Sequence, residues 1–166
     1  MEVNIKKEKT CCFTGHRVID KNQIESLYKK LDRTVEGFIS AGITTFLAGG
    51  ALGFDTLAAL TVLDKREKYP NVRLIICIPC PDQSRSWSER DRAIYDGILS
   101  RADGTVLVSD RYFSGCMHLR NRYMADNSQY CIAYCLDENG KSGSAYTLNY
   151  AKKVGDRTIN LALIPN

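Results

Sequence analysis

The feature that most constrains the fold is an alternation of short apolar runs with longer segments of helical periodicity. The clearest helical segment spans residues 23–40, where apolar side chains recur at i, i+3, i+4 and i+7. Further helices are predicted over 57–68, Trp87 to Leu99, 115–128 and 144–154. Strands are predicted at the apolar runs between the helices, over 10–14, 43–48, 72–78, 105–108, 130–136 and 158–163.

Strands that alternate with helices build βαβ units and therefore a parallel sheet. The predicted strands are apolar at successive positions, which is typical of strands that helices cover on both faces. A length of 166 residues suits one domain. The sequence therefore predicts an α/β fold: a Rossmann-like open, mainly parallel sheet with helices on both faces, in a single domain over residues 1–166.

Composition and charge narrow the setting. Residues 1–7 hold no apolar run like that of a signal peptide, and no window approaches the ~18 apolar residues of a membrane span. We therefore expect a cytoplasmic protein without a membrane partner. The formal net charge of +4 permits an anionic ligand. It argues against strong nucleic-acid binding but leaves weaker binding open. Association into a homo-oligomer also stays open.

The seven cysteines are interpreted first as small buried hydrophobic residues. Cys77 and Cys80 form a C-x-x-C motif, which raises a redox or metal-binding role. No second such motif or nearby histidine pair completes a zinc site, and this one falls at a strand end rather than at a helix N-terminus. We expect no metal site, and a redox role remains an alternative.

Residues that follow the strands are the candidates for function, because ligands of open parallel sheets bind beyond the C-terminal ends of the strands. Most of these segments are rich in Gly, Ser, Thr or Arg, a composition that suits phosphate binding. The segments are Thr14–Arg17, Gly49–Asp55, Pro81–Gln83, Ser109–Arg111 and Gly140–Ser144.

The pattern Gly49-Gly50-x-x-Gly53 precedes a predicted helix. Glycines let a backbone approach an anion, and the N–H groups at a helix N-terminus attract one. A tight turn that packs helix against strand would need the same glycines, so both interpretations stay open. Asp55 falls in the first helical turn, where it either caps the helix or accepts a hydrogen bond from a ribose hydroxyl.

The other candidate residues lie at the same sheet edge or on a helix that could face it. Arginine binds phosphate through its forked guanidinium, and serine or threonine can donate a hydroxyl. Ser144 could instead simply cap its helix. These candidates are Thr14, Gly15, His16, Arg17, Ser109, Arg120, Gly143, Ser144 and Thr147.

These residues also imply an arrangement. We expect the first and fourth strands to be neighbours, so that Arg17 and the loop Ser109–Gly115 flank one crevice. The two Gly-rich turns would lie on either side of it and hold phosphate. Trp87 is expected to cover the site. The sequence contains no Walker A motif and no H-E-x-x-H motif, so no catalytic residue is assigned.

Taken in order, these motifs resemble the YpsA/YoqJ-like family of bacterial and prophage proteins in the SLOG superfamily. The resemblance implies a modified Rossmann-like fold and a nucleotide-derived ligand, such as ADP-ribose, in a sensor-like binding domain. The segments that carry the resemblance are Thr14–Arg17, Gly49–Asp55, Pro81–Trp87, Ala102–Asp103, Ser109 and Tyr112.

Two other branches of the superfamily suggest alternatives. The DNA-processing protein DprA has a segment similar to Arg120–Ala125, which implies single-stranded DNA binding, here through Arg111–Arg122. The Lonely Guy phosphoribohydrolases have a segment similar to Met117–Arg120, which implies a nucleoside-phosphate hydrolase or transferase. Their catalytic Glu corresponds to Tyr150, which cannot act as a carboxylate, so we favour binding over catalysis. An enzyme would need another acid, such as Asp55 or Asp110.

Overall fold

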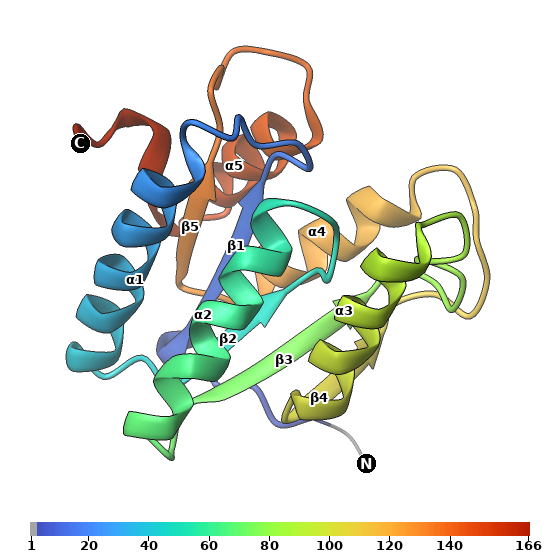
Figure 1. Ribbon diagram of the computed structural model, residues 1–166, viewed down its shortest axis with the longest axis horizontal. Coiled ribbons are helices and arrows are strands. Elements are labelled where there is room, and N and C mark those ends of the chain that lie inside the picture. The colour runs from blue at the N-terminus through green and yellow to red at the C-terminus, as the bar shows by residue number, and fades with distance from the viewer. Residues whose placement is uncertain (1–2) are drawn as a thin grey trace.

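Strands form at all six apolar runs in the computed structural model, which describes residues 3–166 (Figure 1). Met1 and Glu2, part of the N-terminal segment interpreted above, lie outside the described residues. The strands are β1 Thr10–Gly15, β2 Thr45–Ala48, β3 Arg73–Ile78, β4 Gly104–Leu107, β5 Tyr130–Tyr134 and β6 Arg157–Asn160. The helices are α1 Ile24–Ser40, α2 Phe54–Lys68, α3 Glu89–Arg101, α4 Cys116–Asp126 and α5 Gly143–Lys153. Short 3₁₀ turns cover Lys7–Lys9 and Leu161–Leu163.

Several element boundaries differ from the predicted ones. The last strand ends at Asn160, because its side-chain oxygen accepts the N–H of Ala162 and bends the chain into a 3₁₀ turn. Helix α2 begins at Phe54, three residues before the periodic apolar pattern shows it. Helix α3 begins after Trp87, where the Ser88 hydroxyl caps the N–H of Asp91 at 3.1 Å.

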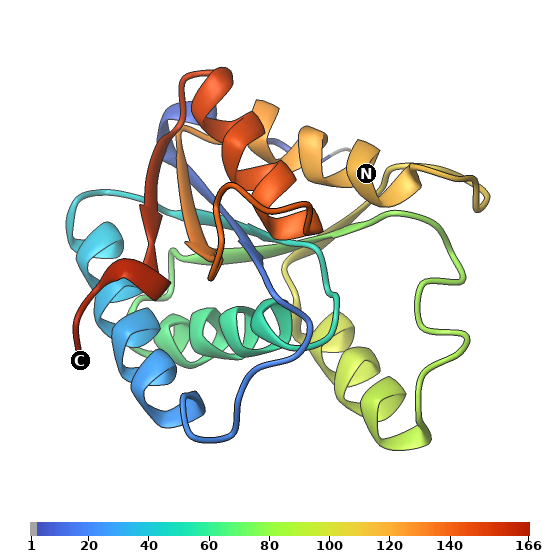
Figure 2. The same ribbon diagram turned by 90° about the horizontal axis from the view of Figure 1, so that it is seen from above.

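The helices cover both faces of the sheet. Figure 2 shows α1, α2 and α3 on one face and α4 and α5 on the other. Successive residues of β1 point to opposite faces of the sheet. Cys11 and Phe13 pack on the face that α1, α2 and α3 cover, and Cys12 packs on the face that α4 and α5 cover. This confirms the predicted α/β fold with two-sided burial. Over residues 3–166, no helix is both long and apolar enough to cross a lipid bilayer.

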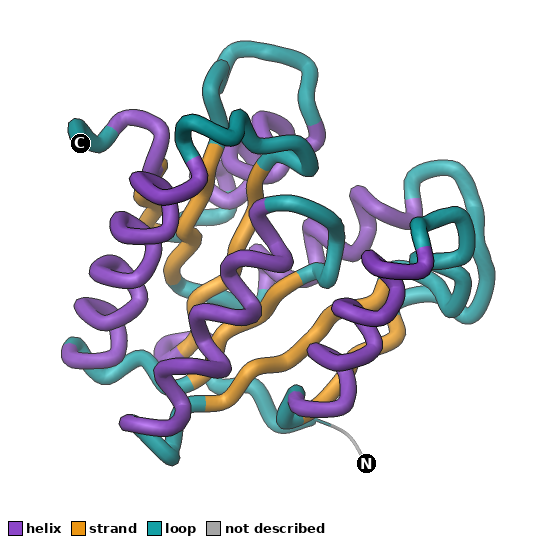
Figure 3. Tube along the Cα trace, in the orientation of Figure 1, coloured by secondary structure: helices purple, strands orange, loops and turns teal. Residues whose placement is uncertain are grey.

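The sheet is entirely parallel, in the order β4-β3-β2-β1-β5-β6. The chain adds strands outward from β1 to β4, then returns to the other side of β1 with β5. The expectation that the first and fourth strands are neighbours is therefore wrong, since β4 is an edge strand. The switch point lies between β1 and β5, and the loops that follow these strands lie together at one end of the sheet (Figure 3).

Asp156 directly precedes β6, at the end of the sheet opposite to these loops, and its carboxylate is buried with 7% of the residue exposed. Neither of its carboxyl oxygens has a hydrogen-bond partner within the described part of the chain. Burial raises the pKa of Asp156 to about 6, while Lys7 lowers it in part and Asp126 raises it further. Ionising this group in the folded protein is therefore costly.

We expect Asp156→Asn to raise the free energy of unfolding at pH 7 by ~1–3 kcal/mol. The folded state favours the protonated carboxyl, so the stability that Asp156 itself contributes is fully present below pH ~4 and is lost as pH rises through about 6. The gain from Asp156→Asn appears as that contribution is lost. Urea unfolding of the unmodified protein and of Asp156→Asn from pH 4 to 8 measures this difference. The free energies of unfolding of the two proteins should converge near pH 4. Asp64→Asn, at an exposed position of α2, is the control. Equal effects of both substitutions would contradict the prediction.

Candidate functional site

A cavity of about 430 Å³ opens at the switch point, beyond the C-terminal ends of β1 and β5. We call it the Arg120 pocket. Four segments build it: the end of β1 with the residues after it, the start of α2, the first half of α4, and the loop into α5. Its lining residues are Phe13, Thr14, Gly15, His16, Arg17, Ala51, Asp55, Met117, His118, Arg120, Asn121, Lys141, Ser142, Gly143 and Ser144.

Arg120 is the buried cation of this pocket, with 3% of its surface exposed. Its Nη1 donates to the carbonyl oxygens of Gly49 and, at 3.2 Å, of Cys77. Nη1 also lies 3.3 Å from Oε1 of Gln83, and Nε donates to Oδ1 of Asn121 at 2.7 Å. Apart from Asn121 in α4 itself, the acceptors come from three segments, namely the turn after β2, strand β3 and the loop after β3, so they fix the plane of the guanidinium.

The second terminal nitrogen of Arg120 keeps donor capacity. Within residues 3–166, the contact recorded for Nη2 is the Met117 sulfur at 3.8 Å, and a thioether is a weak acceptor. The residue nevertheless lines the cavity. A fixed guanidinium with an incompletely used edge, buried at a cavity wall, is suited to an anionic group such as phosphate.

Asp55 lies close to Arg120 and is 6% exposed. Its Oδ2 accepts the N–H of Ala51 at 3.3 Å. Burial raises the pKa of Asp55, and the positive charges of Arg120 and Arg17 oppose that rise. Burial likewise lowers the pKa of Arg120, and Asp55 opposes that change. The two buried groups therefore lower each other's electrostatic cost of burial. The Asp55 carboxyl also lines the pocket, where it can accept a hydrogen bond from a hydroxyl of a ligand.

The N-terminus of α5 forms another wall of the pocket. Ser142 is the N-cap, and its hydroxyl accepts the N–H of Ala145 at 3.1 Å. Within residues 3–166, the N–H groups of Gly143 and Ser144 have no hydrogen-bond acceptor. Together with the positive end of the helix dipole and the neighbouring Lys141, they form a second group of donors for an anion.

His16 joins β1 to this wall. Its Nε2 accepts the backbone N–H of Leu136 at 2.9 Å, and its Nδ1 lies 3.0 Å from the Ser144 hydroxyl. Because the backbone N–H must donate, Nε2 carries no proton, and the neutral ring bears its proton on Nδ1 and donates to Ser144. Burial lowers the pKa of His16, consistent with a neutral ring. In this arrangement His16 positions Ser144 and cannot act as its general base.

The glycines after β2 do not line the pocket, but the protein's own packing requires them. A Cβ at Gly49 would lie 2.6 Å from the Arg120 guanidinium, and one at Gly50 would lie 2.8 Å from the Tyr95 ring. At Gly53 it would overlap the backbone carbonyl of Arg17, and φ there is +77°. Of the two interpretations left open above, the packing one describes their contacts. They position Arg120 and the loop after β1.

The structure brings most of the predicted site residues together and leaves some outside. Thr14, Gly15, His16, Arg17, Asp55, Arg120, Gly143 and Ser144 line the pocket. Thr147 is buried inside α5, where its hydroxyl donates to the Gly143 carbonyl at 2.9 Å. Ser109 follows the edge strand β4 and donates to Arg111 at 2.7 Å. The expected crevice between Arg17 and the loop Ser109–Gly115 does not form, because β4 is not next to β1.

Trp87 does not cover the pocket. It packs edge-to-face on Tyr95 at 5.3 Å between ring centroids and is not a lining residue. Conversely, sequence reasoning placed Lys141, Ser142 and Gln83 in candidate segments without naming them as individual site residues, and it did not name Asn121 as one. A signal existed for Ser142, since a serine directly before a helical segment that opens with Gly143 is an N-cap. Gln83 lies in the candidate segment after β3 but does not line the pocket, and it donates to the Gly49 carbonyl from a polar loop.

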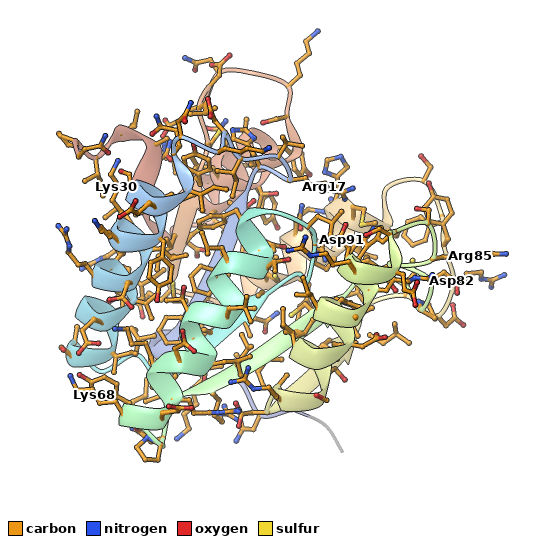
Figure 4. The ribbon with its side chains drawn as sticks, in the orientation of Figure 1. Arg17, Lys30, Lys68, Asp82, Arg85 and Asp91 are labelled. Carbon is orange, nitrogen blue, oxygen red and sulfur yellow. The ribbon has the colours of Figure 1, made fainter. Side chains whose placement is uncertain are left out.

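Arg17, Lys141 and Arg120 make the pocket cationic, and Asp55 is the carboxylate among the lining residues. Arg17 is exposed at the same end of the sheet as the pocket, whereas Lys68 lies at the opposite end of the molecule (Figure 4). Exposure leaves Arg17 free to approach a bound anion from the solvent side. The pocket therefore combines one fixed, buried cation with two exposed ones.

Both cysteines of the C-x-x-C motif are buried, and Cys77 packs on the face of the sheet that α4 and α5 cover. Burial raises the pKa of Cys77 to about 12 and also raises that of Cys80, which keeps both thiols protonated. Over residues 3–166, no group of three or more His, Cys, Asp or Glu side chains is placed to hold a metal ion.

Fold and pocket together define a Rossmann-like α/β protein with a cationic pocket at the switch point of its sheet. The chain belongs to the YspA SLOG family, because the YpsA family model matches residues 11–164. This confirms the resemblance found in its motifs.

Known proteins similar to the chain include UPF0398 proteins of Bacillus thuringiensis (strain Al Hakam) and Bacillus cereus (strain B4264). Each is 28% identical over 157 residues, which cover 89% of this chain and 85% of the relative. Among solved structures, DNA processing protein A from Helicobacter pylori is similar with a TM-score of 0.64 and 20% identity, over 92% of this chain. The match spans 64% of that longer chain, and that protein is described for its single-stranded DNA binding mode. The likeness shows a shared fold.

Proposed function

We propose that the protein binds a nucleotide-derived ligand, such as ADP-ribose or a nucleoside phosphate, with a phosphate in the Arg120 pocket. The observation that carries the proposal is a buried, fixed guanidinium that shares a cavity with the unpaired N–H groups of Gly143 and Ser144. Both are donor groups of the kind that bind phosphate in proteins. Arg17 and Lys141 add positive charge at the rim of the pocket, and Asp55 accepts a hydrogen bond from a ribose hydroxyl.

Binding accounts for the pocket better than nucleoside-phosphate hydrolysis does. Glycoside cleavage requires carboxyl groups that flank the scissile bond, and Asp55 is the one carboxyl group among the lining residues. Tyr150, at the position compared with the hydrolase Glu, donates its hydroxyl to Asp126 at 2.7 Å and lies outside the lining. The fixed protonation of His16 removes a further base.

The proposal predicts stabilisation by phosphorylated nucleosides. A ligand at 100 times its Kd raises the free energy of unfolding by about 2.7 kcal/mol, which in a chain of this size shifts Tm by roughly 5–10 °C. A thermal-shift panel at ~1 mM ligand would contain AMP, ADP, cyclic AMP and ADP-ribose, with adenosine as the control without phosphate. No shift with any phosphorylated member would contradict the proposal.

Arg17→Ala tests the location. Because Arg17 is exposed, its loss should leave Tm of the free protein unchanged while reducing the ligand-induced shift. The matched control is Arg85→Ala, an exposed arginine outside the pocket (Figure 4). If both variants respond to the ligand as the unmodified chain does, the phosphate lies elsewhere.

A further inference from the structure

Next to the Arg120 pocket, an aromatic and basic groove runs between α4 and α5, which lie side by side on one face of the sheet (Figure 2). We call it the α4–α5 groove. It has a volume of about 610 Å³. Three rings and three cations characterise its lining: His118, Tyr146, Tyr150, Arg122, Lys141 and Lys153.

The rings form a continuous row. The rings of His118 and Tyr146 meet at 4.4 Å between centroids, and Tyr146 is followed one helical turn later by Tyr150 at 6.5 Å, with 14° between the ring planes. Tyr146 is 40% exposed. His118 and Tyr146 are exposed and Tyr150 is half-buried, so the row offers a platform on which nucleobases stack with little regard to their identity.

The charges suit a phosphate backbone. Within residues 3–166, Arg122, Lys141 and Lys153 form no ion pair with a carboxylate. Of the nearby acids, Glu138 pairs with Lys152 at 3.1 Å, and Asp126, which accepts a hydrogen bond from the Tyr150 hydroxyl, sets one negative charge against these three cations. The groove therefore carries unneutralised positive charge beside its rings, which is the combination that binds single-stranded nucleic acid.

The groove and the Arg120 pocket are continuous, since His118, Lys141 and Ser142 line both. We propose that the α4–α5 groove is a second subsite, which takes a nucleoside joined through phosphate to the unit held in the Arg120 pocket. This inference rests on the proposed function and specifies the ligand class as dinucleotide or longer. The linking phosphate lies near Lys141, and the second base stacks on Tyr146.

Affinities for three probes test the second subsite: AMP, the phosphodiester-linked dinucleotide pApA, and the pyrophosphate-linked diadenosine diphosphate. We expect pApA or diadenosine diphosphate to bind about 5- to 150-fold more tightly than AMP, the range that one stacked base contributes. The linkage that gains more identifies the kind of ligand. If pApA gains, the logarithm of its affinity should also fall more steeply with the logarithm of salt concentration, by roughly 0.7 for its additional phosphate.

Tyr146→Ala should remove this gain and leave AMP binding within about twofold, because Tyr146 does not line the Arg120 pocket. The matched control is Tyr28→Ala on α1, since Tyr28 is 39% exposed and lies on the other face of the sheet. If neither dinucleotide binds more tightly than AMP, or if both variants behave alike, the second subsite is overturned while AMP binding still supports the proposed function. If none of the three probes binds, the second subsite is overturned, and the proposed function fails with it when AMP, ADP, cyclic AMP and ADP-ribose all give no thermal shift.

Discussion

Replacing Arg120 with methionine is expected to lower the free energy of unfolding by ~3–5 kcal/mol, the cost of removing one partner from a buried charged pair. Methionine keeps most of the side-chain volume but removes the donors to Gly49, Cys77 and Gln83. It also leaves the buried Asp55 carboxyl without the cation that opposes the rise of its pKa. Urea unfolding at pH 7 measures the loss directly.

A double-mutant cycle isolates the charge coupling from the lost hydrogen bonds. In an Asp55→Asn background the buried charge is gone, so Arg120→Met should cost less than it does alone, with a coupling of ~1–3 kcal/mol. Equal costs in the two backgrounds would show that Arg120 acts only through its hydrogen bonds to carbonyls. That result would contradict the electrostatic coupling that we infer from the two pKa directions.

The alternation of apolar runs and helical periodicity was sufficient to predict the α/β class and every strand. It could not predict strand order, because the neighbour of a strand depends on how crossovers pack, and no local pattern encodes that. The short β4 illustrates this: its residues alternate between half-buried and exposed, typical of an edge, but four residues carry little pattern.

The correct edge of the sheet and most of the pocket were predictable because strand ends and Gly-rich turns are marked in the sequence. The burial of Arg120 was not, since Arg120 and Arg122 look equally exposed in a basic helical segment, yet one is buried and the other is exposed. Their difference arises from contacts with Gly49 and Gln83, which are distant in the chain.

The glycines after β2 show why one pattern supports two interpretations. A turn that lets an anion approach and a turn that admits a neighbouring protein group both require a residue without Cβ. At Gly53 the neighbouring group is the loop after β1: the N–H of Phe54 donates to the His16 carbonyl at 3.0 Å, and the Arg17 carbonyl occupies the space of a Cβ. Gly53 thus positions the same loop that supplies His16 and Arg17 to the pocket.

Gly53→Ala is therefore expected to lower the free energy of unfolding by ~3 kcal/mol or more, since backbone strain and steric overlap add at this position. The backbone there has φ +77° and ψ −119°, a conformation that residues with a Cβ rarely adopt, and the Arg17 carbonyl cannot move without breaking the Phe54 contact. The control is Gly37→Ala within α1, where a Cβ would meet open space, and it should stabilise the protein by ~0.5–1 kcal/mol. Urea midpoints that move in opposite directions for the two variants would verify the packing role, whereas a Gly53→Ala variant as stable as the unmodified chain would refute it.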